Sequence, residues 1–234
     1  LSRFAQLLGR VGPERVRVVG THALRVAKNR RAFTVPAKRI LGTRVDVIYG
    51  LEEARLVYLG VAHTLADDAQ SRLVIDIGGG ASSLTATLQQ RGFADLTVLD
   101  VSAEALDASR RNVDSPDEIT WIRADLLDWS PARRWNVWHD RAVFHFLTDA
   151  NDRRRYRELL LRSIEPGGSV ILATFAEDGP STCSALPVER YSADRLLAEI
   201  GSGFIEDGHG RFEHVTPSGG VQPFTWVAAT VYDA

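Results

Sequence analysis

The sequence has no methionine and a single cysteine, Cys183, among its 234 residues. One cysteine excludes an intrachain disulfide framework and any metal site built from several cysteines. No stretch of 18 apolar residues occurs, so the sequence predicts no membrane-spanning helix. The first ten residues lack the basic stub and apolar block of a secretory signal. These absences favour a cytoplasmic protein, and the lack of methionine leads us to expect a processed, fragmentary or edited chain.

The composition is that of an ordinary globular protein, with 44% hydrophobic and 25% charged residues and a net charge of -2. It excludes extensive disorder and suits one or two domains. Charge is uneven, because residues 1–72 hold 13 basic and 6 acidic residues whereas residues 73–234 hold 15 and 24. The basic residues are interleaved with apolar ones, which favours solvated helix faces over a nucleic-acid-binding arm. The asymmetry also fits two parts of different ancestry.

Strands alternate with helices from residue 73 onward. The continuous apolar run at residues 73–77 is typical of the buried centre of a parallel sheet. Two final strands without a helix between them predict an antiparallel hairpin at one edge. Alternation with short connections predicts an α/β fold with a doubly wound, mostly parallel, Rossmann-like sheet of seven strands. The expected strands are 73–77, 96–100, 119–123, 135–139, 168–174, 211–215 and 224–232, and the expected helices are 82–90, 102–112, 152–164 and 192–200.

The first part of the chain predicts an added α/β segment. Its β-branched runs at residues 16–20 and 45–49 are expected strands. Three positions are open for them: an edge of the main sheet, a small separate layer, or exchange between chains. The expected helices of this part are 2–10, 22–41 with an interruption near Pro36, and 51–65, which leads into the strand at 73–77.

Acidic and glycine residues follow the carboxyl ends of successive predicted strands. Gly78, Gly79 and Gly80 come directly after the first strand and open a helix, where they allow a ligand close approach to the backbone. Asp100 ends the next strand, where a carboxylate binds the ribose hydroxyls of a nucleoside. Asp125 follows the third strand and suits an adenine amine, although a turn cap is the alternative. Together these positions predict a nucleoside site.

The chain from Asp76 onward resembles the class I S-adenosylmethionine-dependent methyltransferases. The resemblance covers about 160 residues and departs from the family mildly at Ser82, where many members have glycine. It rests on the order and spacing of five segments, which are Asp76–Ser82, Leu99–Ser102, Ala124–Leu126, His139–Phe146 and Glu165–Gly168.

The resemblance implies S-adenosylmethionine as cofactor and gives roles to residues of this chain. The glycine loop would face the methionine part, Asp100 the ribose, and Asp125 with Leu126 the adenine. His139 and Asp140 would lie near the methyl sulfonium. The cofactor-binding residues implied are Asp76, Gly78, Gly79, Gly80, Asp100, Val101, Asp125, Leu126 and His139.

Methyl transfer is an in-line displacement in which the enzyme mainly positions the acceptor and excludes water. Asp140, Arg141 and His145 are the candidates for catalysis. His145 is suited to accept a proton near neutral pH, and a histidine packed in the core is the alternative. The expected acceptor is a small molecule of unknown identity, and no metal is expected.

Residues 1–80 resemble a different family, the exopolyphosphatases and guanosine-pentaphosphate phosphohydrolases of the actin-like ATPase fold. The resemblance rests on Val18–Arg25, Tyr49–Leu56 and Leu73–Gly80. It implies that Glu53 is a catalytic base and that the glycine loop binds phosphate. The chain departs from that family after the glycines, where Ala81-Ser82-Ser83 replaces Ser-Thr-Glu, and it lacks the family's first phosphate loop.

The two resemblances meet at the glycine loop, which predicts a natural or engineered chimera of a phosphatase-derived part (residues 1–72) and a methyltransferase-like domain (residues 73–234). Three functions remain open: a cofactor-binding methyltransferase with weak or no turnover, a folded chimera without activity, and a polyphosphate hydrolase. The orphaned N-terminal strands also predict a homodimer through residues 1–65.

Overall fold

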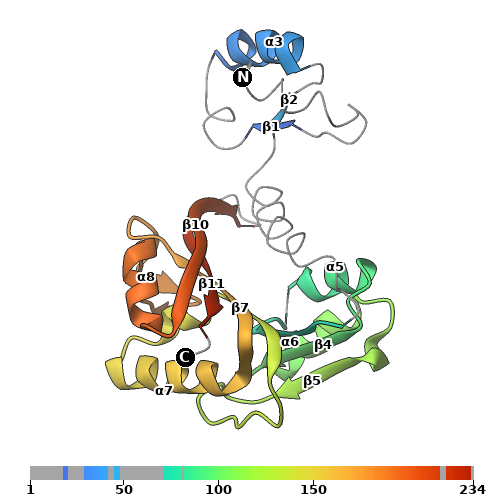
Figure 1. Ribbon diagram of the computed structural model, residues 1–234, viewed down its shortest axis with the longest axis vertical. Helices are drawn as coiled ribbons and strands as arrows, with labels where there is room; N and C mark the ends of the chain where they lie inside the picture. The colour runs from blue at the N-terminus through green and yellow to red at the C-terminus, as the bar shows by residue number, and fades with distance from the viewer. Residues whose placement is uncertain are drawn as a thin grey trace. The chain divides into compact units, whose positions relative to one another are not determined.

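A computed structural model describes two compact units of the chain (Figure 1). One unit consists of the segments up to Gly60 together with Phe212–Val221, and the other runs from Val61 to Arg211 and from Gln222 to the end. The domain boundary between residues 72 and 73 stays a prediction. The residues described are 18–20, 29–41, 45–47, 71–80, 82–216 and 220–232.

A seven-stranded sheet dominates the larger unit, and it confirms the predicted α/β fold. Four of its strand pairs are parallel, β3 with β4, β3 with β6, β4 with β5 and β6 with β7. The chain moves outward from β3 in one direction and then returns to the other side, which is the doubly wound arrangement. The order across the sheet is β10 (Phe204–Val215), β11 (Val221–Val231), β7 (Ile164–Phe175), β6 (Trp135–Arg141), β3 (Leu73–Ile77), β4 (Asp95–Asp100) and β5 (Ile119–Arg123).

The last two strands form the predicted non-parallel end of the sheet. β11 pairs antiparallel with β7, with Phe224 opposite Phe175, and β10 occupies the edge. β10 begins at Phe204, seven residues before the predicted start at residue 211. Charged and glycine residues in Glu206–Gly210 hide its strand pattern, because an edge strand exposes much of its surface and needs little apolar alternation.

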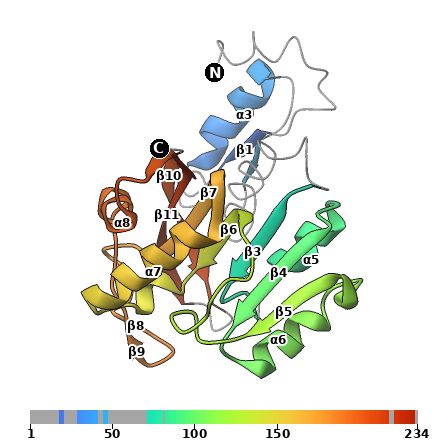
Figure 2. The same ribbon diagram turned by 60° about the horizontal axis from the view of Figure 1, so that its bottom comes forward.

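The four predicted helices of this unit are present, with ends shifted by at most two residues. They are α5 (Leu84–Gln90), α6 (Ala103–Arg110), α7 (Ala150–Ser163) and α8 (Ala193–Ile200). Figure 2 shows α5 and α6 beside β4 and β5 and α7 beside α8. The sequence did not predict four short elements: the 3-10 helices η3 (Pro116–Glu118) and η4 (Phe144–Phe146), and the strand pair β8 (Thr182–Cys183) and β9 (Leu186–Pro187).

Alternate residues of the central strands face two different layers. Ile75, Ile77 and Trp138 belong to the main core, with side chains of α7 and α8 such as Leu160 and Leu196. Asp76 and His139, one residue away along their strands, therefore point to the opposite face. This alternation decides which strand-end residues reach the site described below.

The N-terminal unit contains a separate parallel strand pair. β1 (Val18–Gly20) pairs with β2 (Val45–Val47) in its own two-stranded sheet, so of the three positions left open the structure has the separate layer. Helix α3 (Arg30–Leu41) continues through Pro36, and the predicted interruption there was wrong. The proline costs the helix one backbone hydrogen bond, which its other turns tolerate. The expected helices at 2–10 and 51–65 lie outside the described residues.

Within the described part of the chain, no helix is long and apolar enough to cross a membrane.

Candidate functional site

The glycine loop after β3 is packed so tightly that side chains do not fit on it. Gly78 has φ of +66°, and its N–H donates to the carbonyl of Leu99 over 2.7 Å. A Cβ on Gly78 would overlap the side chain of Val143, and one on Gly79 would overlap the carboxylate of Asp76. Leu99 on β4 and Val143, two residues beyond β6, thus constrain the loop's path, which explains why Gly78 and Gly79 have no side chain.

Asp100, at the end of β4, holds the same loop from the other side. One carboxylate oxygen accepts from the N–H of Gly80 over 3.0 Å, and the other accepts from the N–H of Ser102 over 2.9 Å. A carboxylate oxygen has two lone pairs, so both oxygens keep accepting capacity for a ligand. Val101 follows with 66% of its surface exposed, which leaves an apolar side chain next to this carboxylate.

Asp125 and Leu126 follow β5, and their turn is tied to β4 by the N–H of Ala124, which donates to the carbonyl of Asp100 over 3.1 Å. Asp125 is exposed, and its Oδ1 accepts from the N–H of Leu127 over 2.9 Å, as a turn cap does. The side chain of Leu126 is buried in the main core. In this structure the carboxylate of Asp125 therefore caps its own turn.

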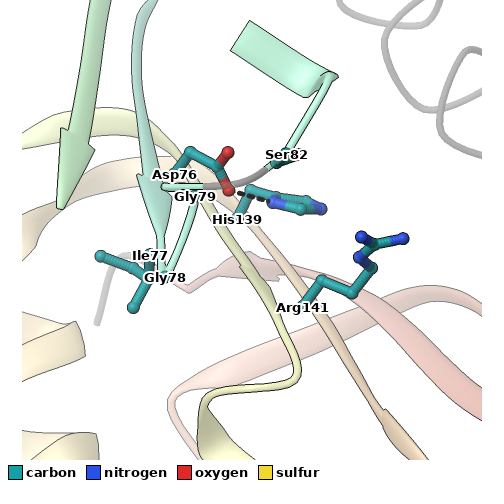
Figure 3. Close-up of a pocket in the computed structure, with 7 residues that line it drawn as sticks. All are labelled: Asp76, Ile77, Gly78, Gly79, Ser82, His139 and Arg141. Atoms are coloured by element: carbon teal, nitrogen blue, oxygen red, sulfur yellow. Dashed lines mark hydrogen bonds and ion pairs between the residues drawn. The ribbon is translucent and has the colours of Figure 1, made fainter. Parts of the chain in front are cut away.

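Asp76, His139 and Arg141 come together by sheet register. Asp76 on β3 is the direct partner of His139 on β6, and the carboxylate Oδ1 lies 2.7 Å from the imidazole Nδ1. Arg141 is two residues beyond His139 and so shares its face. Figure 3 shows the three side chains in one pocket, with the His139 ring and the Arg141 side chain reaching toward the same side. The lining residues are Asp76, Ile77, Gly78, Gly79, Ser82, His139 and Arg141.

The pocket contains a buried carboxylate oxygen without a partner among the described residues and an exposed cationic side chain. Asp76 is 3% exposed, and its Oδ2 is buried without a hydrogen-bond partner in the described part of the chain. A buried carboxylate oxygen without a partner is costly, and a donor or cation from a ligand would satisfy it. Arg141 is exposed, and among the described residues its guanidinium has no ion-pair partner. The arrangement therefore suits a ligand with a positive and a negative group.

Asp140 points away from this pocket, into the main core. It is fully buried, and its carboxylate accepts from the N–H groups of Val143 (2.9 Å) and Phe144 and from the hydroxyl of Tyr156 (2.7 Å). The same hydroxyl accepts from Nε1 of Trp138 over 2.9 Å. Burial raises the pKa of Asp140 to about 6, although the hydrogen bond from Tyr156 and those from the backbone lower it. These contacts give Asp140 a structural place, and they do not bring it to the pocket.

His145 also lies outside the pocket. The side chain is fully buried, with its ring 4.6 Å from that of Phe146 and 4.7 Å from that of Phe175 between centroids. Burial lowers its pKa to about 4, so the imidazole is neutral at physiological pH. Neither ring nitrogen has a hydrogen-bond partner among the described residues. The structure therefore places His145 in the core, where the sequence alternative had it, but without the expected partners.

Two residues that position the loop and Asp140 were missed by reasoning from sequence. Val143 is the neighbour that requires glycine at Gly78, and Tyr156 on α7 holds Asp140. Both contacts join distant segments, and the sequence has no local pattern for them. A buried tyrosine inside an amphipathic helix was the available signal, because such a hydroxyl usually finds a polar partner.

No metal was expected, and the described residues contain no group of three or more histidine, cysteine, aspartate or glutamate side chains arranged to hold one.

Comparison with protein families divides the chain into two overlapping parts. Residues 1–101 match the model of the Ppx/GppA phosphatase family, and residues 74–168 match that of a methyltransferase domain. The matches overlap over β3, the glycine loop and β4. The chain is thus similar to two families, as the two sequence resemblances predicted.

Curated relatives resemble the first part. The guanosine-5'-triphosphate,3'-diphosphate pyrophosphatase of Photobacterium profundum is 52% identical over 84 residues, which are 36% of this chain and 17% of that protein. The enzyme of the same name from Pseudoalteromonas atlantica is 39% identical over 133 residues, 49% of this chain and 26% of that one. The chain spans about a sixth to a quarter of the length of these relatives.

Solved structures resemble the second part. The N-methyltransferase NodS of Bradyrhizobium japonicum WM9, crystallised with S-adenosyl-L-homocysteine, has a TM-score of 0.56 at 17% identity, with 74% of this chain and 86% of that one covered. The glycopeptide N-methyltransferase MtfA has a TM-score of 0.55 at 19% identity, with 79% and 90% covered. At such identities the likeness shows the fold, which is that of the class I methyltransferases.

Proposed function

We propose that residues 73–234 bind S-adenosylmethionine at the carboxyl ends of β3, β4, β5 and β6 and transfer its methyl group to a small molecule. The observation that carries the proposal is the unsatisfied Oδ2 of Asp76, buried beside a glycine loop that Asp100 holds from the other side. The neighbours NodS and MtfA, each crystallised with S-adenosyl-L-homocysteine, support the choice of ligand.

The residues present fit each part of that cofactor. The α-amino group of its methionine moiety supplies the cation that Oδ2 of Asp76 lacks. The ribose hydroxyls are donors for the remaining lone pairs of Asp100. The exposed side chain of Val101 offers an apolar surface to the adenine ring, and the carboxylate of Asp125 lies on the next turn.

The protein's part in such a reaction is binding and positioning. The cofactor supplies an electrophilic methyl group, so the chain needs to hold the acceptor in line with it and exclude water. Gly78 and Gly79 allow a ligand to approach the backbone because no side chain fits there. Arg141, exposed and without an ion pair in the described chain, is suited to bind an anionic group of the acceptor.

Calorimetry with S-adenosyl-L-homocysteine tests the cofactor site. We expect Asp100→Ala to weaken binding by roughly 1.5–3 kcal/mol, because hydrogen bonds to an ionised group are lost. Asp107→Ala is the matched control, since this exposed carboxylate on α6 only faces Arg110. Equal affinity of the Asp100→Ala variant and the unchanged chain would refute the role of Asp100, and no binding by the unchanged chain would refute the proposal.

A folded chimera that binds cofactor without turnover is the second candidate, favoured by the likeness of the first part to a phosphatase rather than to a methyltransferase cap. To distinguish this candidate from an active enzyme, we would measure the conversion of S-adenosylmethionine to S-adenosyl-L-homocysteine with a panel of small amines, thiols and phenols. An active enzyme would convert it with at least one acceptor, whereas the inactive chimera would not. The polyphosphate hydrolase hypothesis depends on Glu53, which lies outside the described residues, and on an acidic residue that Ala81-Ser82-Ser83 does not supply.

A further inference from the structure

The chain turns from β6 into η4 through a strained residue. Ala142 has φ of +68°, in the left-handed region that a residue with a side chain rarely adopts, because its Cβ comes too close to the following carbonyl oxygen. Its N–H donates to the carbonyl of Ala173 on β7 over 2.8 Å, which ties the turn to the sheet. Strain of this kind persists only where surrounding contacts impose it. The turn Asp140–Val143 therefore needs a group that holds it.

The carboxylate of Asp140 is in a position to hold this turn. One oxygen accepts from the N–H of Val143 over 2.9 Å, and the other accepts from the N–H of Phe144 over 3.2 Å. Both N–H groups come directly after Ala142 in the chain, so the two bonds span the strained residue. Hydrogen bonds to an ionised acceptor are stronger than those between neutral groups, which suits them to offset backbone strain.

The same carboxylate is anchored in the main core. Tyr156 on α7 donates its hydroxyl hydrogen to Oδ2 of Asp140 over 2.7 Å, and its oxygen accepts from Nε1 of Trp138 over 2.9 Å. These three side chains are fully buried, and the ring of Phe144 lies 4.8 Å from that of Tyr156 between centroids. A buried polar network with its hydrogen bonds made is rigid. The core thus fixes the place of the carboxylate, and the carboxylate fixes the turn.

The residues on either side of Ala142 both reach the ligand pocket. Arg141 lines the pocket and is exposed (Figure 3). Val143 packs against the glycine loop so closely that a Cβ on Gly78 would overlap its Cγ2. A change of φ at Ala142 from the left-handed to the right-handed region would redirect the chain between these two residues. The conformation of one residue therefore decides where a wall of the loop and a cation of the pocket lie.

We propose that Asp140 is a positioning residue of the cofactor site, which it serves by holding Ala142 in the left-handed conformation. Val143 then stays against the glycine loop, and Arg141 stays in the pocket. The inference rests on the proposed methyltransferase function, because the ligand that depends on the turn is the cofactor of that reaction. Asp140 itself does not line the pocket, and it acts through the backbone of the residues that follow it.

Removal of the carboxylate should weaken binding of S-adenosyl-L-homocysteine by about tenfold. Without its two hydrogen bonds, we expect Ala142 to occupy the left-handed region in roughly one molecule in ten. Where binding requires a minor conformer, the apparent affinity falls with the population of that conformer. Calorimetry of the full chain and of Asp140→Ala at pH 8 measures the loss, and Asp140 is ionised there because its pKa is about 6.

A second substitution distinguishes this role from a general loss of stability. Glycine populates the left-handed region about as readily as the right-handed one. Ala142→Gly, added to Asp140→Ala, should therefore return the affinity to within about twofold of that of the unchanged chain. A residue that only stabilised the fold would not be replaced in this way by a change of backbone preference. A double variant that binds as weakly as Asp140→Ala would overturn the proposal.

Leu160→Ala is the matched control for damage to the core. Leu160 is fully buried on α7 and belongs to the same core as Tyr156. Its truncation leaves a cavity and lowers stability, but it removes no hydrogen-bond acceptor from the turn. We expect this variant to bind S-adenosyl-L-homocysteine as the unchanged chain does, at a temperature where both are folded. An equal loss of affinity in Leu160→Ala and Asp140→Ala would show that binding responds to loosening of the core, and would overturn the role of Asp140.

Hydrogen exchange in the unchanged chain tests the same coupling even where Asp140→Ala does not fold. The N–H of Phe144 lies in a buried residue and exchanges when its bond to Asp140 opens. If binding needs the closed turn, S-adenosyl-L-homocysteine at about ten times its dissociation constant should slow this exchange by about tenfold. The N–H of Arg195, which donates to Oγ of Ser192 at the start of α8, is the control and should exchange at an unchanged rate. The same response of both amides to the ligand would overturn the proposal.

The outcomes separate the inference from the function on which it rests. Failure of the unchanged chain to bind S-adenosyl-L-homocysteine would end the methyltransferase proposal and this inference with it. Binding by the unchanged chain, together with an equal affinity of Asp140→Ala, would overturn the role of Asp140 alone and leave the cofactor site in place.

Discussion

Gly78 and Gly92 have the same left-handed backbone conformation but different surroundings. Replacing each by alanine measures how much those surroundings contribute to stability. Gly78 and Gly92 both have positive φ, at +66° and +87°, but only a Cβ on Gly78 meets another side chain, that of Val143. Gly92→Ala should cost about 1–2 kcal/mol of unfolding free energy from backbone strain alone. Gly78→Ala should cost about 1–3 kcal/mol more, because it also overpacks the loop.

Urea unfolding of the two variants measures that difference, and binding of S-adenosyl-L-homocysteine provides a second readout. We expect Gly92→Ala to leave the affinity unchanged and Gly78→Ala to reduce it. Equal losses of stability would mean that Val143 moves aside freely and that its packing does not determine the loop.

Asp140 makes stability depend on pH. Its pKa is about 6 in the folded chain, against 3.8 ordinarily, because burial penalises the charge. A raised pKa means that the protonated carboxyl stabilises the fold at low pH, and this contribution is lost as pH rises through about 6. Between pH 4.5 and 7.5 the unfolding free energy of the unchanged chain should therefore fall by about 2 kcal/mol relative to that of Asp140→Asn.

Urea unfolding of both chains at the two pH values checks the prediction. His145 titrates in an overlapping range with the opposite sign, since its pKa is lowered, but it is common to both chains and cancels in the difference. A difference that stays constant with pH would show that Asp140 is ionised in the fold without penalty.

At the scale of elements, helix caps differ in a way that the sequence does not show. Ser102 and Ser83 both precede helices, α6 and α5. Oγ of Ser102 accepts from the N–H of Ala105 over 3.1 Å, whereas the side chain of Ser83 makes no capping bond. Ser102→Ala should cost about 1 kcal/mol of unfolding free energy, and Ser83→Ala a few tenths at most.

Thermal unfolding of the two serine variants side by side provides the measurement. Similar melting temperatures for both would indicate that solvent replaces the Ser102 cap, and that α6 is held by Leu106 and its other buried contacts instead.

For the whole molecule, we predict association through the N-terminal segment. Helix α3 exposes Phe33 (45%), Val35 (51%) and Ile40 (43%). The β1–β2 pair is too small to be stable alone. Exposed apolar side chains of this kind favour contact with a second copy. Light scattering at micromolar concentration should show a dimer, and Phe33→Glu should shift it toward the monomer.

Leu161→Lys serves as the control, because Leu161 is similarly exposed (40%) but lies on α7 in the larger unit. A monomer that persists as concentration rises would remove the dimer hypothesis. A dimer that Phe33→Glu leaves intact would place the contact elsewhere.

We also expect no polyphosphatase activity above background. The acidic residue that follows the glycines in that family is replaced by Ala81-Ser82-Ser83, so the likeness of the first part supplies only some of the required groups. Phosphate release from polyphosphate with magnesium measures the activity, and Glu53→Gln is its control. Release that disappears in Glu53→Gln would show that the phosphatase part functions.

The sequence by itself determined the doubly wound sheet and the position along the chain of the residues proposed to bind a ligand. β3 and β5 have the predicted limits, and Asp76, Asp100 and Asp125 each lie within two residues of a strand end. These features depend on apolar periodicity and on glycine, which act over a few residues and are visible in the sequence. The same local signals failed at β10, whose exposed edge position leaves no clear alternation.

Only the tertiary structure decided which side chains meet. His139 and Asp140 are neighbours in sequence, yet sheet alternation sends one to Asp76 in the pocket and the other to Tyr156 in the core. The burial of His145 and the pairing of β1 with β2 depend likewise on packing between distant segments. Strand register and helix packing are fixed by the sum of many contacts across the fold, and no short stretch of sequence contains that sum.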